Sequence, residues 1–130
     1  MTTTLTSNVG DVVHAPIATV APSATLEAAA SLLAADQVGL LVVVDPTGVR
    51  GVLSERDIVA AVADGVELAV ERVADFAVTD VLMVDEASTI RETATLMGEA
   101  QVRHLLVTRR GTPVGVVSIR DLLAALLPTA

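Results

Sequence analysis

The sequence predicts an α/β (α+β) fold in which two copies of one half-domain pack about a pseudo-twofold axis. At an offset of 64, residues 9–62 align with residues 73–126 without a gap. About 17 of these pairs are identical, which indicates an internal duplication rather than chance. A half of this size leaves the inner faces of its sheet and helices uncovered, so we expect the two halves to pack face to face.

Each copy has the pattern strand, helix, strand, strand, helix. In the first copy, Pro22 and Ser23 break a short strand ahead of a helix, and the run Asp45-Pro46-Thr47-Gly48 predicts a hairpin turn. The expected elements there are a strand at 17–20, a helix from 25, strands at 40–44 and 49–54, and a helix at 57–63. The second copy repeats them as a strand at 81–84, a helix at 89–100, strands at 104–108 and 114–118, and a helix from 121.

These elements divide the chain into four parts. We expect a flexible N-terminal tail at 1–8, a first repeat at 9–65, a helical connector at 66–72 and a second repeat at 73–127.

Composition excludes several classes of function. Hydrophobic residues make up 52% of the chain and aromatic residues 1%, so the predicted core is built from Val, Leu, Ile and Ala. The formal charge of -8 repels nucleic acids and anionic membrane surfaces, and we expect neither as a partner. The absence of Cys excludes disulfides and thiolate metal sites and suits a cytoplasmic protein. No apolar run approaches the roughly 18 residues that a membrane span needs.

Two strings and one strand resemble parts of a cystathionine-beta-synthase (CBS) repeat. The strings are Gly51-Val52-Leu53-Ser54-Glu55-Arg56-Asp57 and Gly115-Val116-Val117-Ser118-Ile119-Arg120-Asp121, and the strand is Val102-Arg103-His104-Leu105-Leu106-Val107. The resemblance covers residues 9–126, so the chain is similar to a stand-alone pair of CBS repeats, also called a Bateman module. It implies a regulatory sensor of an adenine nucleotide such as AMP or ATP, or of another adenosyl ligand. It also implies a protein that is not an enzyme and needs no cofactor, and that pairs as a homodimer.

The resemblance also implies which residues bind the ligand. In such modules the Ser hydroxyl lies near the phosphate and the Asp carboxylate lies on the ribose hydroxyls. The residues that the resemblance assigns to ligand binding are Thr19, Arg103, His104, Ser118, Arg120, Asp121, Ser54, Arg56 and Asp57. It places residues 19–22 beside the Asp121 site and residues 83–86 beside the Asp57 site.

Physical chemistry supports these roles independently. At a strand-to-helix junction, free backbone N–H groups and the positive end of the helix favour an anion, and a Ser hydroxyl adds a donor. An ionised Asp only accepts hydrogen bonds, so it suits the two hydroxyls of a ribose. Arg56 and Arg120 are candidate phosphate donors.

The second site is expected to be the stronger one. It has Arg103 and His104 where the first repeat has Gly39 and Leu40. Asp85 and Glu86 are expected to oppose an anion near Asp57.

Other interpretations remain open. The Ser and Asp residues of both strings are also typical helix caps, so a ligand-free scaffold that works through protein contacts is the alternative function. A Ser hydrolase is improbable because there are two His residues and no Gly-x-Ser-x-Gly elbow, and no metal site is expected. The chain offers no recognisable effector domain, so the expected sensor acts on a partner, with an unidentified effector protein as one possibility. The Ala- and Leu-rich helix from Asp121 is a candidate association face.

Overall fold

The computed structural model describes residues 2–13 and 17–127, and these belong to two compact units. The first-repeat unit is Ala18–Val81, and the second-repeat unit combines Met1–Ile17 with Leu82–Ala130. The opening segment of each repeat is therefore part of the unit that holds the rest of the other repeat.

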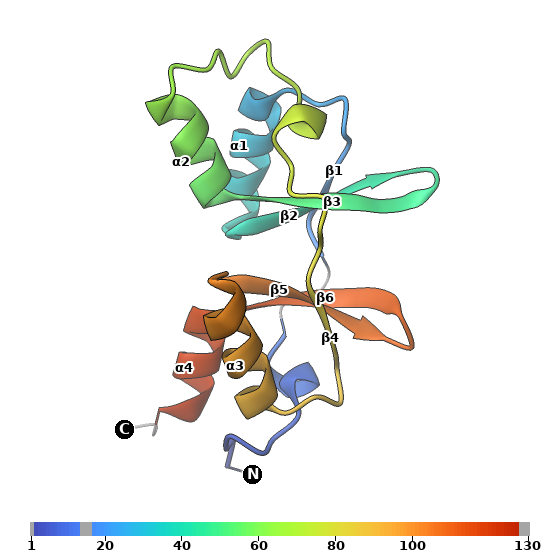
Figure 1. Ribbon diagram of the computed structural model, residues 1–130, viewed down its shortest axis with the longest axis vertical. Coiled ribbons are helices and arrows are strands. Elements are labelled where there is room, and N and C mark those ends of the chain that lie inside the picture. Colours follow the sequence, from blue (N-terminus) through green and yellow to red (C-terminus); the bar gives the residue numbers. More distant parts are fainter. Residues whose placement is uncertain (1, 14–16, 128–130) are drawn as a thin grey trace. The chain divides into compact units, whose positions relative to one another are not determined.

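The first-repeat unit contains a three-stranded sheet with two α-helices on one of its faces (Figure 1). The strand order is β1-β2-β3, with β1 parallel to β2 and β2 antiparallel to β3. Its elements are β1 (Thr19–Val20), α1 (Leu26–Asp36), β2 (Leu40–Asp45), β3 (Gly48–Ser54), α2 (Glu55–Ala63) and the 3-10 helix η2 (Val73–Asp75).

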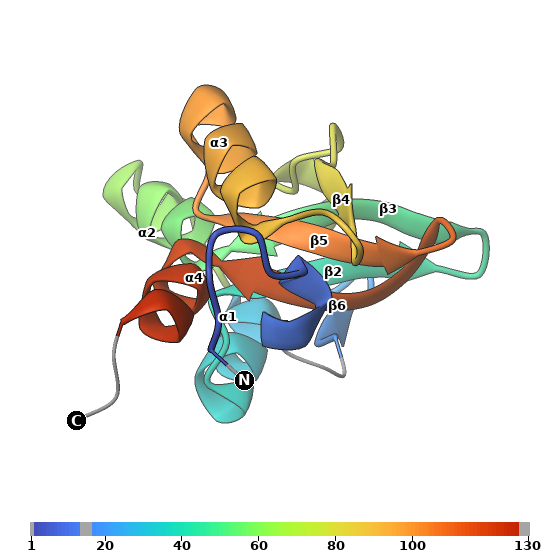
Figure 2. The same cartoon turned by 90° about the horizontal axis from the view of Figure 1, so that it is seen from below.

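The second-repeat unit has the same architecture. The strand order is β4-β5-β6, with the same parallel and antiparallel pairings. Its elements are the 3-10 helix η1 (Val9–Val12), β4 (Met83–Asp85), α3 (Ile90–Ala100), β5 (His104–Arg109), β6 (Thr112–Ser118) and α4 (Ile119–Leu126). Figure 2 shows η1, drawn in blue, next to α4. The predicted order of strands and helices in each repeat is confirmed.

The duplication extends to the ends of the helices. Thr25 caps α1 by accepting a hydrogen bond from the Ala28 N–H at 3.1 Å, and its repeat partner Thr89 caps α3 in the same way. Gln37 and Gln101 end these helices in the left-handed conformation, with φ of 53° and 57°. Equivalent residues therefore determine where each long helix begins and ends.

Each unit has its own aliphatic core, which includes one valine from the other repeat. Leu26, Leu41 and Leu53 are at most 1% exposed in the first-repeat core, and Val73 is fully buried among them. In the second-repeat core, Val9 is fully buried in the equivalent position. Because these valines come from η2 and η1, each core depends on the opening segment of the other repeat, which we call the exchanged segment.

The exchanged segments also hold the starts of the long helices. The sequence predicts a helical connector at 66–72, but this part forms a turn. The carbonyl groups of Leu68 and Glu71 accept hydrogen bonds from the first N–H groups of α1 at 2.9 and 3.0 Å, and a continuous helix would turn these carbonyls away. In the segment predicted as a tail, the carbonyls of Leu5 and Ser7 accept from the first N–H groups of α3, both at 2.9 Å. Ser7 is the repeat partner of Glu71, so the two segments have the same role.

Candidate functional site

Each Ser-x-x-Asp string lies where the last strand of a unit passes into its last helix. Ser54 ends β3 and is the N-cap residue of α2, and Ser118 ends β6 and is the N-cap residue of α4. Both serines have extended backbone, which lets the side chain turn toward the first helical turn. The Asp three residues later is thereby brought next to the Ser.

In the first-repeat unit, Ser54 and Asp57 form a capping box. The Asp57 N–H donates to Ser54 Oγ at 3.2 Å, and the Ser54 N–H donates to Asp57 Oδ2 at 2.8 Å. The Ser54 hydroxyl donates to the same Oδ2 at 3.0 Å. Within the described residues, Oδ1 of Asp57 accepts no hydrogen bond. That oxygen is therefore the one with capacity for a ligand hydroxyl.

The second-repeat unit has the same capping box. The Ser118 N–H donates to Asp121 Oδ2 at 2.9 Å, and the Asp121 N–H donates to Ser118 Oγ at 3.0 Å. Both side chains are half-buried. The structural role that the sequence allows for these residues is therefore present in both repeats.

The capping boxes occupy most of the backbone N–H groups that the sequence predicts to be free for an anion. At the start of α4, the Ser118 and Asp121 N–H groups are used in the box, and the Ile119 N–H donates to the Arg103 carbonyl at 2.9 Å. Of the first four N–H groups, only that of Arg120 has no partner within the described residues. An anion bound at this helix start would therefore depend mainly on side-chain cations.

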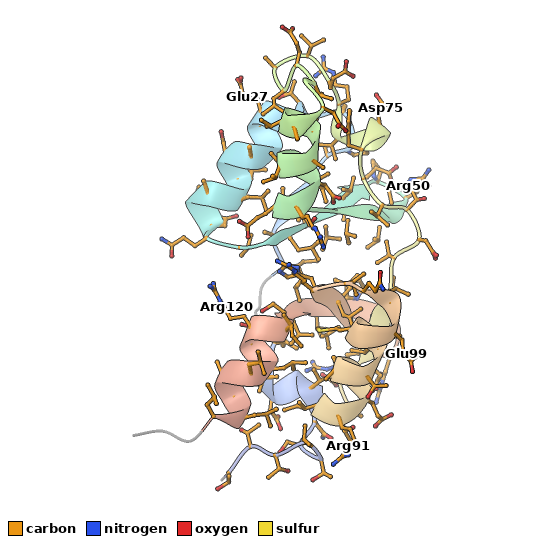
Figure 3. The ribbon with its side chains drawn as sticks, turned by 60° about the vertical axis from the view of Figure 1, so that its left-hand side comes forward. Glu27, Arg50, Asp75, Arg91, Glu99 and Arg120 are labelled. Atoms are coloured by element: carbon orange, nitrogen blue, oxygen red, sulfur yellow. The ribbon has the colours of Figure 1, made fainter. Side chains whose placement is uncertain are left out.

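The two junctions differ in their basic residues. His104 is the direct cross-strand partner of Ser118, and it is half-buried. Arg103 precedes it and is exposed, and Arg120 projects from the start of α4 (Figure 3). In the first-repeat unit, the partner of Ser54 is Leu40, which is 6% exposed.

At the first-repeat junction, Gly39 replaces Arg103, and its carbonyl accepts from the Glu55 N–H at 3.0 Å. Arg56 is exposed at the start of α2. Only one of the predicted basic residues is thus present here, against three at the second junction.

Thr19 lies in the first-repeat unit, on β1, where it pairs with Val42 and is exposed. It therefore shares a sheet with Ser54. The residues predicted beside it, including Asp121, belong to the second-repeat unit.

The two carboxylates predicted to oppose an anion have partners in their own unit. Asp85 Oδ2 accepts from the Ala87 N–H at 2.9 Å. Glu86 forms an ion pair with Arg109, with Oε1 at 2.8 Å from Nε, and this pair raises the pKa of Arg109. The charge of Glu86 is therefore largely balanced locally.

The first-repeat unit also has an open cavity of about 600 Å³, which the sequence did not predict. It lies at the other end of the sheet from Ser54, between the β1–α1 turn, the end of β2 and the segment around η2. The signal was present in the repeat alignment. Pro22 and Asp45 at the cavity align with Glu86 and Arg109 of the second copy, so the two repeats differ in charge at both positions.

Two features are absent from the part of the chain that the structure describes. No three His, Cys, Asp or Glu side chains gather there as metal ligands. None of the helices in residues 2–13 and 17–127 combines the length and apolar character of a membrane span.

A family model and a curated relative both identify the CBS domain in this chain. The model of the CBS domain matches the chain twice, at residues 9–64 and 73–128. A CBS domain-containing protein of Bacillus subtilis is 28% identical over 116 residues, which cover 89% of this chain and 83% of that protein.

Solved structures of CBS-domain proteins resemble this chain along nearly its whole length. A CBS-domain-containing protein from Agrobacterium tumefaciens is 30% identical with a TM-score of 0.87, covering 95% of this chain and 96% of that one. A CBS domain protein from Pyrobaculum aerophilum, solved in complex with AMP, is 28% identical with a TM-score of 0.80. That match covers 92% of this chain and 98% of the other.

Proposed function

Because the chain belongs to the CBS domain family, we propose that it is a regulatory module that binds an adenine nucleotide such as AMP or ATP. The observation that carries the proposal is the AMP complex of the Pyrobaculum aerophilum protein, which this chain matches over nearly its whole length. The repeated Ser-x-x-Asp junctions give each unit a carboxylate and a hydroxyl of the kind that a nucleoside phosphate requires.

The junction of the second-repeat unit is proposed as the stronger site. His104 pairs with Ser118 across the sheet, Arg103 precedes His104, and Arg120 precedes Asp121, so three basic residues belong to this junction. Because most backbone N–H groups are already used, the guanidinium groups of Arg103 and Arg120 would supply the charge that attracts a phosphate, with His104 as a further hydrogen-bonding group. The Asp121 carboxylate would accept hydrogen bonds from the ribose.

The junction of the first-repeat unit is proposed as weak. It keeps Ser54, Arg56 and Asp57, but Leu40 and Gly39 take the places of the other basic residues. One guanidinium on an exposed helix start attracts phosphate weakly in water, since solvent screens its charge.

A bound nucleotide would influence a partner protein through surfaces outside the two junctions. Val59 and Val62 on α2 are 66% and 57% exposed, and Leu123 on α4 and Leu127 just beyond it are 56% and 65% exposed. Exposed aliphatic residues on adjacent helical turns are typical of association surfaces. We propose that a second copy covers them in a cytoplasmic homodimer and that an effector protein senses the bound state.

The scaffold function is the second candidate, and one observation favours it. Both Ser-x-x-Asp pairs are engaged in capping boxes, so the fold has a reason to keep them even without a ligand. In that case, the exposed residues of α2 and α4 would be the functional surface.

A thermal-shift panel separates the two candidates. It contains AMP, ADP, ATP, S-adenosylmethionine, NADH and cyclic dinucleotides, with adenosine as the control that lacks a phosphate. A ligand at about 100 times its Kd adds about 2.7 kcal/mol to stability, which raises the melting temperature by several degrees. We expect such a rise with at least one nucleotide and a smaller one with adenosine. No rise with any compound would favour the scaffold.

A further inference from the structure

The cavity of the first-repeat unit is separate from the nucleotide junction. Its walls come from the turn after β1, the end of β2 and the segment Arg72–Asp75. Asp45 ends β2, whereas Leu40, the partner of Ser54, begins it, so about 17 Å of strand separates the two places. A volume of about 600 Å³ is within the range of small-molecule sites.

Hydrogen bonds between its walls hold the cavity in shape. The Ala74 N–H donates to the Pro22 carbonyl at 2.9 Å, and Arg72 Nη1 donates to the Ser23 carbonyl at 3.0 Å. These bonds join η2 to the turn after β1. Two of the walls are therefore held together by the fold itself, although the cavity is open to solvent and most of its lining residues are exposed.

Charges of both signs line an otherwise apolar surface. Pro22, Val44 and Pro46 contribute aliphatic surface, and Arg72 and Asp75 contribute charge. Within the described residues, neither Arg72 nor Asp75 forms an ion pair. Figure 3 shows Asp75 on the same side of the unit as Arg50.

Asp45 adds a second negative charge at the edge of the cavity. Hydrogen bonds from Thr47 and the nearby Arg50, whose Nε is 3.3 Å from Asp45 Oδ2, lower the pKa of Asp45. Arg50 balances much of the charge of Asp45, as Arg109 does for Glu86, so Asp75 is the carboxylate of the cavity that has no ion pair within the described residues.

The same place in the second-repeat unit is bridged by an ion pair. Glu86 and Arg109 stand at the positions of Pro22 and Asp45, and their side chains meet at 2.8 Å. Gly10 replaces Ala74, and a Cβ there would lie 3.0 Å from the Glu86 carbonyl oxygen and Cβ. The first-repeat unit cannot form this ion pair, because Pro22 carries no charge at the position of Glu86.

We propose that this cavity is a second small-molecule site, for a zwitterion of the amino-acid type with an aliphatic side chain. The ligand carboxylate pairs with the guanidinium of Arg72, which can donate two parallel hydrogen bonds. The ligand ammonium lies at Asp75. The aliphatic side chain rests on Pro22 and the residues around it.

The test is calorimetric titration of the full chain with L-leucine and three analogues at millimolar concentration. Leucinamide lacks the carboxylate, 4-methylpentanoic acid lacks the ammonium, and glycine lacks the side chain. We expect L-leucine to bind and each analogue to bind about tenfold more weakly or not at all. Failure of L-leucine, L-valine and L-methionine to bind would overturn the proposal, as would equal binding of the analogues.

Matched variants assign the binding to the cavity. Asp75→Asn alters a side chain without hydrogen bonds in the described residues, so folding is retained, and we expect affinity for L-leucine to fall about tenfold. Asp80→Asn makes the same change outside the cavity and serves as the control. Equal affinity of the two variants would contradict the site. Asp121→Asn must leave L-leucine binding intact, which separates this proposal from the nucleotide site.

Discussion

Ser118 and Asp121 exchange hydrogen bonds in both directions, with the Ser118 N–H 2.9 Å from Asp121 Oδ2 and the Asp121 N–H 3.0 Å from Ser118 Oγ. This pair stabilises the start of α4, and the same two side chains are proposed to meet a nucleotide. A substitution that keeps the capping oxygen but removes the charge can separate the two roles.

Asp121→Asn is therefore predicted to lose nucleotide binding with little loss of stability. Its amide oxygen can still accept from the Ser118 N–H, whereas Asp121→Ala removes the acceptor and lowers the free energy of unfolding by about 1 kcal/mol. Urea unfolding and thermal shift with AMP measure the two effects. Asp57→Asn is the matched control in the weaker junction and should keep the AMP shift. Retention of that shift by Asp121→Asn would contradict the assigned role.

The exchanged valines are predicted to stabilise the fold across repeats. Val9 and Val73 are both fully buried in the core of the other repeat, so Val9→Ala or Val73→Ala should lower the free energy of unfolding by about 2 kcal/mol. Val70→Ala makes the same change at a site that is 59% exposed and should have little effect. Urea unfolding of the three variants measures this, and equal stabilities would show that the exchange contributes nothing.

Two glycines are predicted to respond oppositely to alanine. A Cβ on Gly51 would lie 2.6 Å from the Val78 carbonyl oxygen, so Gly51→Ala must displace the backbone and should cost about 1–3 kcal/mol. A Cβ on Gly98, within α3, would meet no heavy atom within 4 Å apart from the backbone of its own helix and its chain neighbours. Gly98→Ala should therefore stabilise the helix by up to about 1 kcal/mol. Thermal unfolding distinguishes these signs, and a shift in the same direction for both would be inconsistent with the packing of β3 against Val78.

The cap of α3 is predicted to weaken in acid. The Thr89 backbone N–H and then its side chain lower the pKa of Glu92, so the folded-state value lies below the unfolded one. The stabilisation is full above the unfolded pKa of about 4.3 and is lost as the pH falls through the folded value.

Glu92→Gln tests this directly, because Gln keeps the capping oxygen but does not titrate. Its melting temperature should fall less steeply than that of the natural protein between about pH 5 and pH 3. Parallel curves for the two proteins would mean that Glu92 has no part in the acid sensitivity.

Much of the fold follows from local patterns in the sequence. Thr25 and Thr89 mark helix starts, and the residues at the Asp45–Gly48 hairpin mark a turn, because each acts through hydrogen bonds with its own neighbours. The Ser54–Asp57 and Ser118–Asp121 junctions were found for the same reason. Because the two repeats align at an offset of 64, each helix start and turn assigned in the first copy could be assigned in the second copy as well.

Features that depend on long-range contacts were not predictable in this way. Residues 66–72 have helical composition, but the carbonyls of Leu68 and Glu71 accept hydrogen bonds from the first N–H groups of α1, which the Thr25 side chain does not cap. The burial of Val9 in the second-repeat core also depends on contacts far along the chain. At the candidate site, the sequence predicted the Ser and Asp caps but not how many backbone N–H groups the capping boxes would use.

The most direct test of nucleotide binding is isothermal titration calorimetry of the full chain with AMP. We predict saturable binding with about one strong site per chain, abolished in Asp121→Asn and retained in Asp57→Asn. Absence of saturable heat with AMP, ADP and ATP would contradict the nucleotide assignment, and two equal sites per chain would contradict the difference between the junctions.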